Sequence, residues 1–61
     1  MSRFEELLAP LDDDRRDLLL LRFDAGLTTK EIAGILGKSD GAVRTQLSRT
    51  LKTLKEYYHA E

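Results

Sequence analysis

Apolar residues recur at helical spacing along most of this chain, and the polar residues between them indicate where each helix begins and ends. A short first helix is predicted over residues 3–9, with an apolar side formed by Phe4, Leu7 and Leu8. Ser2 and Glu5 have the S-x-x-E spacing of a capping box at its start. Pro10 ends this helix, because the residue before a proline is pushed out of the helical region.

The second helix is predicted over residues 13–25, with Gly26 as the residue just past its end. Asp12 is its candidate N-cap, and Asp13 and Asp14 follow in the first turn, where carboxylates favour the positive end of the helix dipole. We interpret the three aspartates as capping residues and not as a metal site. Consecutive residues at a helix start point in different directions and do not converge on one ion.

Apolar side chains occupy more of the circumference of this second helix than a single apolar stripe would. At about 100° per residue, Leu20 lies nearly opposite Leu18, with Leu19 and Phe23 to one side. One face is shared by Leu11, Leu18, Leu21 and Ala25. This distribution predicts a central helix that touches more than one neighbour. Alternatively, Leu20 stays on the surface as part of a protein-docking patch.

The third helix is predicted over residues 29–36 from two signals at its start. Thr28 and Glu31 have the T-x-x-E spacing of a capping box, in which each side chain bonds the backbone amide of the other residue. Leu27 and Ile32 lie just before and four residues after the cap, as in a hydrophobic staple.

The last helix is predicted from residue 40 to at least residue 57, after a turn that contains Gly37 and an N-cap at Ser39. Residues 56–61 are expected to fray. A single buried stripe is predicted from Val43, Leu47, Leu51, Leu54 and Tyr58.

Together these elements predict an all-α, four-helix domain over residues 1–61 that contains a helix-turn-helix, between Thr28 and Leu54. Ala33 lets the last helix cross close to the third, and Val43 closes the small core between them. The full predicted core is Phe4, Leu8, Leu11, Leu18, Leu21, Ile32, Ala33, Leu36, Val43, Leu47, Leu51 and Leu54.

The composition excludes several classes of function. The 61 residues include no cysteine, no apolar run of the ~18 residues that span a bilayer, and no signal-peptide core. His59 is the lone histidine, and the chain has no phosphate loop, nucleophile signature or metal-ligand cluster. We therefore expect a cytoplasmic, monomeric or weakly associating domain, not an enzyme, with no cofactor, no membrane contact and no small-molecule substrate.

The net charge of −1 conceals an asymmetry along the chain. Residues 1–34 hold five basic and eight acidic side chains, a net of −3, whereas residues 35–61 hold five basic and three acidic, a net of +2. No acidic residue interrupts the last helix between Gly41 and Lys55. Positive charge is therefore concentrated on the second helix of the motif, as expected for a helix that approaches DNA.

The first turns of the last helix carry side chains that can hydrogen-bond to base edges in a major groove. Arginine can pair with guanine O6 and N7, and serine or threonine can bond to any base edge. The candidate base-reading residues are Arg44, Thr45, Ser48 and Arg49. Phosphate contacts are expected from Thr29, Lys30, Lys38 and Lys52.

These residues resemble region 4 of the sigma-70 family of bacterial RNA polymerase sigma factors, and the extracytoplasmic-function group most closely. The match rests on Arg16, Leu21, Arg22, Gly26, Leu27, Thr28, Glu31, Ile32, Ala33, Leu36, Gly37, Ser39, Gly41, Val43, Arg44, Leu47 and Arg49. The chain departs from the family pattern at four places. No proline follows Leu11, Asp40 is acidic where the family varies, Gln46 replaces a frequent arginine, and Thr50 replaces the usual alanine.

The resemblance implies a domain that docks its last helix into the upstream, or minus thirty-five, element of double-stranded promoter DNA. It also implies binding to the flap of the polymerase beta subunit and, often, to an anti-sigma factor. The regions that melt the promoter are not in this chain, so it is not expected to start transcription alone. Two alternatives remain: a LuxR-type effector domain, and a sigma-like decoy that binds only proteins.

Overall fold

The computed structural model describes residues 3–59, which contain helices and no strand. The order is α1 (Arg3–Leu7), α2 (Asp13–Leu19), a π-helical turn η1 (Leu20–Asp24), α3 (Thr29–Leu36) and α4 (Asp40–His59). The all-α class and the four predicted helices are confirmed.

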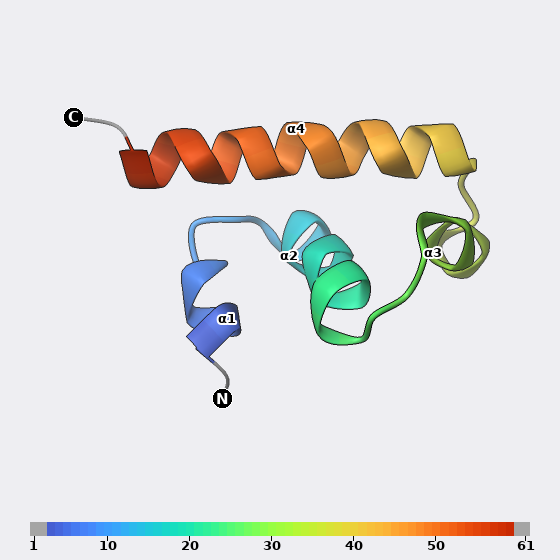
Figure 1. Cartoon of the computed structure of the whole chain (residues 1–61), viewed down its shortest axis with the longest axis horizontal. Coiled ribbons are helices and arrows are strands. Elements are labelled where there is room, and N and C mark those ends of the chain that lie inside the picture. The colour runs from blue at the N-terminus through green and yellow to red at the C-terminus, as the bar shows by residue number, and fades with distance from the viewer. Residues whose placement is uncertain (1–2, 60–61) are drawn as a thin grey trace.

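Helix α4 runs along one side of the molecule, and α1, α2 and α3 pack along its other side (Figure 1). Its 20 residues span about 30 Å at 1.5 Å per residue, close to the longest molecular dimension of 36 Å. The most extensive contact between separate helices is that of α3 with α4. This arrangement covers one face of α4 and leaves its opposite face uncovered.

The first helix is shorter than predicted. It ends at Leu7, and residues 8–10 form a turn in which the Leu8 amide donates to the Glu5 carbonyl at 3.1 Å. Pro10 lies within this turn, consistent with its predicted role as the end of the helix. The predicted capping box lies outside the described residues because it includes Ser2.

The aspartates at the start of α2 include the predicted N-cap. The Arg15 amide donates to Asp12 Oδ1 at 3.0 Å, which makes Asp12 the N-cap. Asp13 in the first turn pairs with the Arg16 guanidinium. Within residues 3–59, no cluster of three or more His, Cys, Asp or Glu residues is placed to hold a metal ion.

The prediction of one continuous α-helix over residues 13–25 is wrong in its second half. Residues Leu20–Asp24 form a π-helical turn, and the Ala25 amide donates to the Leu20 carbonyl five residues earlier, at 2.9 Å. The burial in this segment also differs from the predicted face. Leu18 and Leu19 are both fully buried, Leu20 and Leu21 are half-buried against the core, and Ala25 is exposed.

The end of the π-helical turn is tied to the start of α3. Gly26 adopts a left-handed conformation with φ of 75°, as predicted for the residue past the helix. Arg22 donates from Nη1 to the Leu27 carbonyl at 3.2 Å, and its guanidinium lies 5.4 Å from the centre of the Phe23 ring. The Phe23 ring in turn meets Phe4 of α1 edge to face.

The boundaries of α3 agree with the prediction because both of its ends carry local signals. The Glu31 amide donates to Thr28 Oγ1 at 3.1 Å, and the Thr28 amide donates to Glu31 Oε1 at 2.9 Å, which completes the capping box. Gly37 ends the helix at φ of 68°, a left-handed conformation that favours glycine. Ser39 Oγ then accepts from the Ala42 amide at 3.1 Å and caps α4.

The core contains most of the predicted residues. Those buried are Leu8, Leu11, Leu18, Ile32, Ala33, Val43 and Leu47, while Phe4, Leu21 and Leu54 pack at its edge. Leu36 and Leu51 were predicted to be buried but are 40% and 42% exposed. The sequence prediction also missed two buried residues, Leu19 and Thr50.

The error at Leu51 has a geometric cause. The prediction took two successive steps of four residues, from Val43 through Leu47 to Leu51, and each such step drifts about 40° around a helix that turns about 100° per residue. The observed stripe alternates steps of four and three, through Val43, Leu47, Thr50 and Leu54. Leu36 is exposed for a different reason: it is the last residue of α3, where neighbouring helices cover only part of it.

The C-terminal end of α4 is helical where fraying was predicted. The helix continues to His59, which agrees with the predicted extent to at least residue 57 but not with the fraying expected over residues 56–59, while residues 60–61 lie outside the described range. Tyr58 was assigned to the buried stripe but is 47% exposed. Its hydroxyl donates to the Leu7 carbonyl at 2.6 Å, which ties the end of α4 to the end of α1.

The core assignment can be tested with two leucines of the same helix. Leu47→Ala should lower the free energy of unfolding by roughly 2–5 kcal/mol, because it removes a side chain that is only 7% exposed. Leu51→Ala should cost about 1 kcal/mol or less. Urea unfolding followed by circular dichroism measures both, and equal losses at the two positions would contradict the described packing.

Thr50 provides a second stability test, because its side chain is buried and its hydroxyl has no hydrogen-bond partner among the described residues. Thr50→Val keeps the shape and removes the hydroxyl, so the free energy of unfolding should rise by about 1 kcal/mol. For a domain of this size the melting temperature should then rise by roughly 4–8 °C. The exposed Thr53→Val is the matched control, and a comparable gain there would refute this explanation.

Candidate nucleic-acid interface

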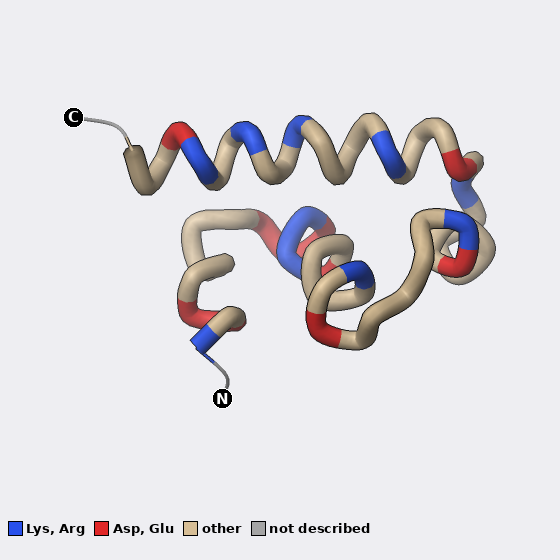
Figure 2. The backbone as a smooth tube through the Cα atoms, viewed as in Figure 1, with Lys and Arg blue, Asp and Glu red and all other residues tan. Residues whose placement is uncertain are grey.

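The uncovered face of α4 presents all four candidate base-reading residues to solvent. Arg44, Thr45, Ser48 and Arg49 are exposed and lie within the first three turns of the helix. Lysine and arginine recur along α4 with no acidic residue between Asp40 and Glu56 (Figure 2). The helix therefore offers a polar, cationic surface of the kind that enters a major groove.

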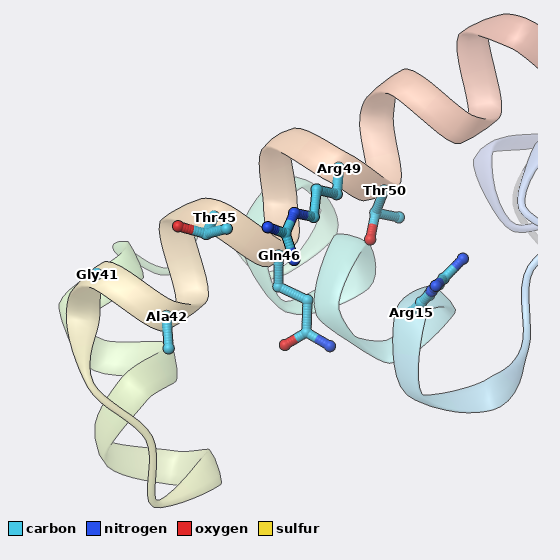
Figure 3. Close-up of a pocket in the computed structure, with 7 residues that line it drawn as sticks. All are labelled: Arg15, Gly41, Ala42, Thr45, Gln46, Arg49 and Thr50. Atoms are coloured by element: carbon cyan, nitrogen blue, oxygen red, sulfur yellow. The ribbon is translucent and has the colours of Figure 1, made fainter.

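Along one flank of this face, α4 and the start of α2 form an open groove of about 430 Å³ (Figure 3). Thr50 points its hydroxyl toward the side of the groove where Arg15 lies. Among residues 3–59, the charged residues that line the groove are two arginines, and the lining consists of Arg15, Gly41, Ala42, Thr45, Gln46, Arg49 and Thr50. Its charge and its donors suit an anion.

Arg15 is a residue that sequence reasoning did not assign to the site. It lies 34 positions before Arg49 and outside the helix-turn-helix, and no local motif connects the two. Only the packing of α2 against α4 brings it to the groove. The sequence carried no signal for this placement.

On the other flank, an acidic residue joins two of the predicted contacts. The Thr29 hydroxyl donates to Asp40 Oδ1 at 2.6 Å, and Arg44 Nε lies 3.3 Å from Asp40 Oδ2. Thr29 is half-buried, so its hydroxyl serves the contact between α3 and α4. The Arg44 side chain remains 67% exposed despite this ion pair.

The three lysines proposed for phosphates occupy separate parts of the surface. Lys30 is exposed in the first turn of α3, and Lys52 is exposed further along α4. Lys38, in the turn between these helices, donates from Nζ to Gln46 Oε1 at 3.0 Å. Gln46 stands at a position where arginine is frequent in the family. The bond from Lys38 therefore brings the lysine ammonium close to the position of that arginine.

Other chemistry is sparse in the part of the chain that the structure describes. His59, the lone histidine, is exposed at the end of α4. None of the described helices combines the length and the apolar character needed to cross a membrane. The exposed arginine, lysine and hydroxyl side chains of α4 are suited to binding through hydrogen bonds and charge.

Comparison with known proteins identifies relatives over most of the chain. The family model described as "Sigma-70, region 4" matches residues 1–54. The ECF RNA polymerase sigma factor ShbA of Streptomyces griseus is 45% identical over 51 residues, which cover 84% of this chain. The ECF RNA polymerase sigma factor SigD of Mycobacterium tuberculosis is 39% identical over 56 residues, or 92% of this chain.

A third relative, the probable RNA polymerase sigma factor RfaY of Xanthomonas campestris, is 40% identical over 50 residues, or 82% of this chain. The matched segments make up 12% of RfaY, 27% of ShbA and 26% of SigD, so the chain spans a small part of each relative. No solved structure matched the chain.

The capping box that positions α3 predicts a pH dependence of stability. The amide of Thr28, and then its hydroxyl, hold the pKa of Glu31 below its usual value of 4.5. Since the pKa is lower in the folded state, the unfolded chain binds a proton more readily in acid. Stabilisation by Glu31 should be complete above about pH 4.5 and be lost as pH falls through the folded-state pKa.

Glu31→Gln is the control, because glutamine can fill the same position in a capping box but does not titrate. Melting temperatures of both proteins, measured between about pH 7 and pH 3, should converge in acid. A constant difference between the two proteins over that range would contradict a contribution from the Glu31 charge.

Proposed function

Because the chain belongs to the sigma-70 region 4 family, we propose that it recognises the upstream, or minus thirty-five, element of a promoter with α4 in the major groove. The observation that carries this proposal is the uncovered face of α4, where Arg44, Thr45, Ser48 and Arg49 are exposed together. These side chains carry the donors and acceptors that distinguish base pairs.

The proposed phosphate contacts lie around this face. Lys30, Lys38 and Lys52 supply cations from α3, the turn and α4, and the groove adds Arg15 of α2 as a further contact. Thr29 contributes through the backbone at the start of α3, because its hydroxyl proton is donated to Asp40. Phosphate contacts fix the register of the helix, while the base contacts supply specificity.

We further propose that the same domain docks on RNA polymerase through apolar side chains outside the DNA face. Leu36 and the half-buried Leu20 and Leu21 line an open groove of about 320 Å³, together with Asp17, Asp24 and Ala25. Exposed apolar side chains rimmed by charge are typical of protein contacts. The beta-subunit flap is the proposed partner there, with an anti-sigma factor as a competitor, and the cytoplasm as the compartment.

Two alternatives make different demands on α4. The match to sigma-70 region 4 over residues 1–54 favours the sigma family over a LuxR-type effector domain. A protein-binding decoy would keep the apolar groove but would not need a cationic, uninterrupted outer face on α4. The chain spans only 12–27% of the length of these relatives, so we do not propose that it starts transcription alone.

A salt titration of binding to promoter duplex tests the proposal. Neutralising about four phosphates should give a slope of log affinity against log salt of roughly −3 to −4. Lys52→Ala should weaken binding to all sequences alike and make the slope shallower by about one unit. Arg3→Ala, on α1, removes an exposed cation away from this face and should leave the slope unchanged. A slope near zero, or no sequence preference at low salt, would favour the decoy.

A further inference from the structure

Asp40 joins the two helices of the motif at the point where α4 would first meet DNA. It is the first residue of α4, and its side chain is 35% exposed. One carboxylate oxygen accepts from the Thr29 hydroxyl at 2.6 Å, and the other lies 3.3 Å from Arg44 Nε. Thr29 thus holds the carboxylate from α3, while Arg44 contacts it from one turn further along α4.

The atoms used in this contact determine what Arg44 can still do. Asp40 faces Nε, on the side of the guanidinium, so both terminal nitrogens remain available for other partners. Guanine presents O6 and N7 as neighbouring acceptors in the major groove, and two parallel N–H donors at the end of an arginine match them. A carboxylate that holds Nε is therefore compatible with guanine recognition by the same side chain.

Restraint before binding has a further consequence. Arginine is long and adopts many rotamers, so ordering it at an interface costs conformational entropy. A side chain that an ion pair already orients loses less on binding. The same carboxylate repels DNA phosphates, which makes a non-specific complex weaker unless Arg44 gains a base contact in return.

We propose that Asp40 is a positioning residue that orients Arg44 to read a guanine, and that Thr29 orients Asp40 for this role. The inference rests on the proposed function, since it requires α4 to lie in the major groove. It assigns to Asp40 a contribution to specificity, through Arg44, and to the Thr29 hydroxyl a contribution that involves no contact with DNA.

Asp40→Asn tests the role of the charge. Asparagine keeps the size and can still accept from Thr29, but its amide nitrogen cannot pair with the arginine N–H. Affinities are measured for the preferred duplex, for single-base-pair variants of it, and for random duplex. Discrimination at one G·C pair should fall about fivefold or more, while binding to random duplex should tighten about two- to fivefold.

The loss of discrimination and the tighter binding to random duplex, taken together, distinguish the positioning role of Asp40 from simpler explanations. A purely structural loss would weaken binding to specific and random duplex together. Simple removal of a repulsive charge would tighten both equally and leave discrimination at every base pair unchanged. Either result would overturn the inference.

Variants of Thr29 test the orientation without altering charge. Thr29→Val removes the hydroxyl and should reduce discrimination at the same G·C pair several-fold, with binding to random duplex unchanged. Thr29→Ser keeps the hydroxyl and should behave as the parent. Arg44→Lys keeps the charge but lacks the two-donor fork, so it should lose the preference, and adding Asp40→Asn should then have no further effect on it.

A measurement without DNA separates failure of this inference from failure of the proposed function. In the free domain, the Arg44 Nε–H resonance should shift in Asp40→Asn and Thr29→Val but not in Thr29→Ser. A resonance unaffected by either variant would refute the restraint, whatever DNA the domain binds. If the resonance shifts but the parent binds no duplex, the proposed function fails, and base reading by Arg44 fails with it.

Discussion

The packing of α4 against α3 is the contact on which the rest of this domain depends. Ile32 and Ala33 on α3, and Val43 and Leu47 on α4, are buried in the single core that also takes Leu18 and Leu19. Ala33 contributes almost no side chain, which allows a close approach of the two helices. Because this one face of α4 is buried, the opposite face is left exposed to solvent, and its orientation relative to α3 is set.

A domain of 61 residues has little apolar area to bury. Local hydrogen bonds therefore contribute strongly to where its helices begin and end and to how they are oriented. Asp12, Thr28 and Ser39 each cap a helix start, and Gly26 and Gly37 allow the chain to leave a helix in a left-handed turn. At the far end, the Tyr58 hydroxyl holds α1 against α4 across 51 residues of sequence. Each of these contacts fixes an orientation that the small core alone would specify weakly.

The charge distribution reconciles a net negative chain with a surface suited to DNA. The acidic side chains are concentrated before residue 35, many at helix starts where they favour the helix dipole. Asp40 is one of three acidic residues after that point, with Glu56 and Glu61, and it is the first residue of α4. There its charge is shared between Thr29 and Arg44, so it is held at the edge of the cationic face by two defined partners.

The sequence by itself determined the number of helices, the exact extent of α3 and the start of α4, because these depend on signals within a few residues. Capping boxes, glycines and N-caps act through neighbouring backbone groups and need no distant partner. The exposed base-reading candidates of α4 could also be placed from sequence, since they lie opposite an apolar stripe.

The tertiary structure decided what depends on distant partners. It introduced the π-helical turn at Leu20–Asp24, buried Leu19 and Thr50, and exposed Leu36 and Leu51. It also brought Arg15 to the groove beside Arg49, and Thr29 to Asp40. Helical periodicity limits which residues can share a face of a helix. Residues of one face still differ by a few tens of degrees around the helix axis, and the position of the neighbouring helix decides which of them is buried.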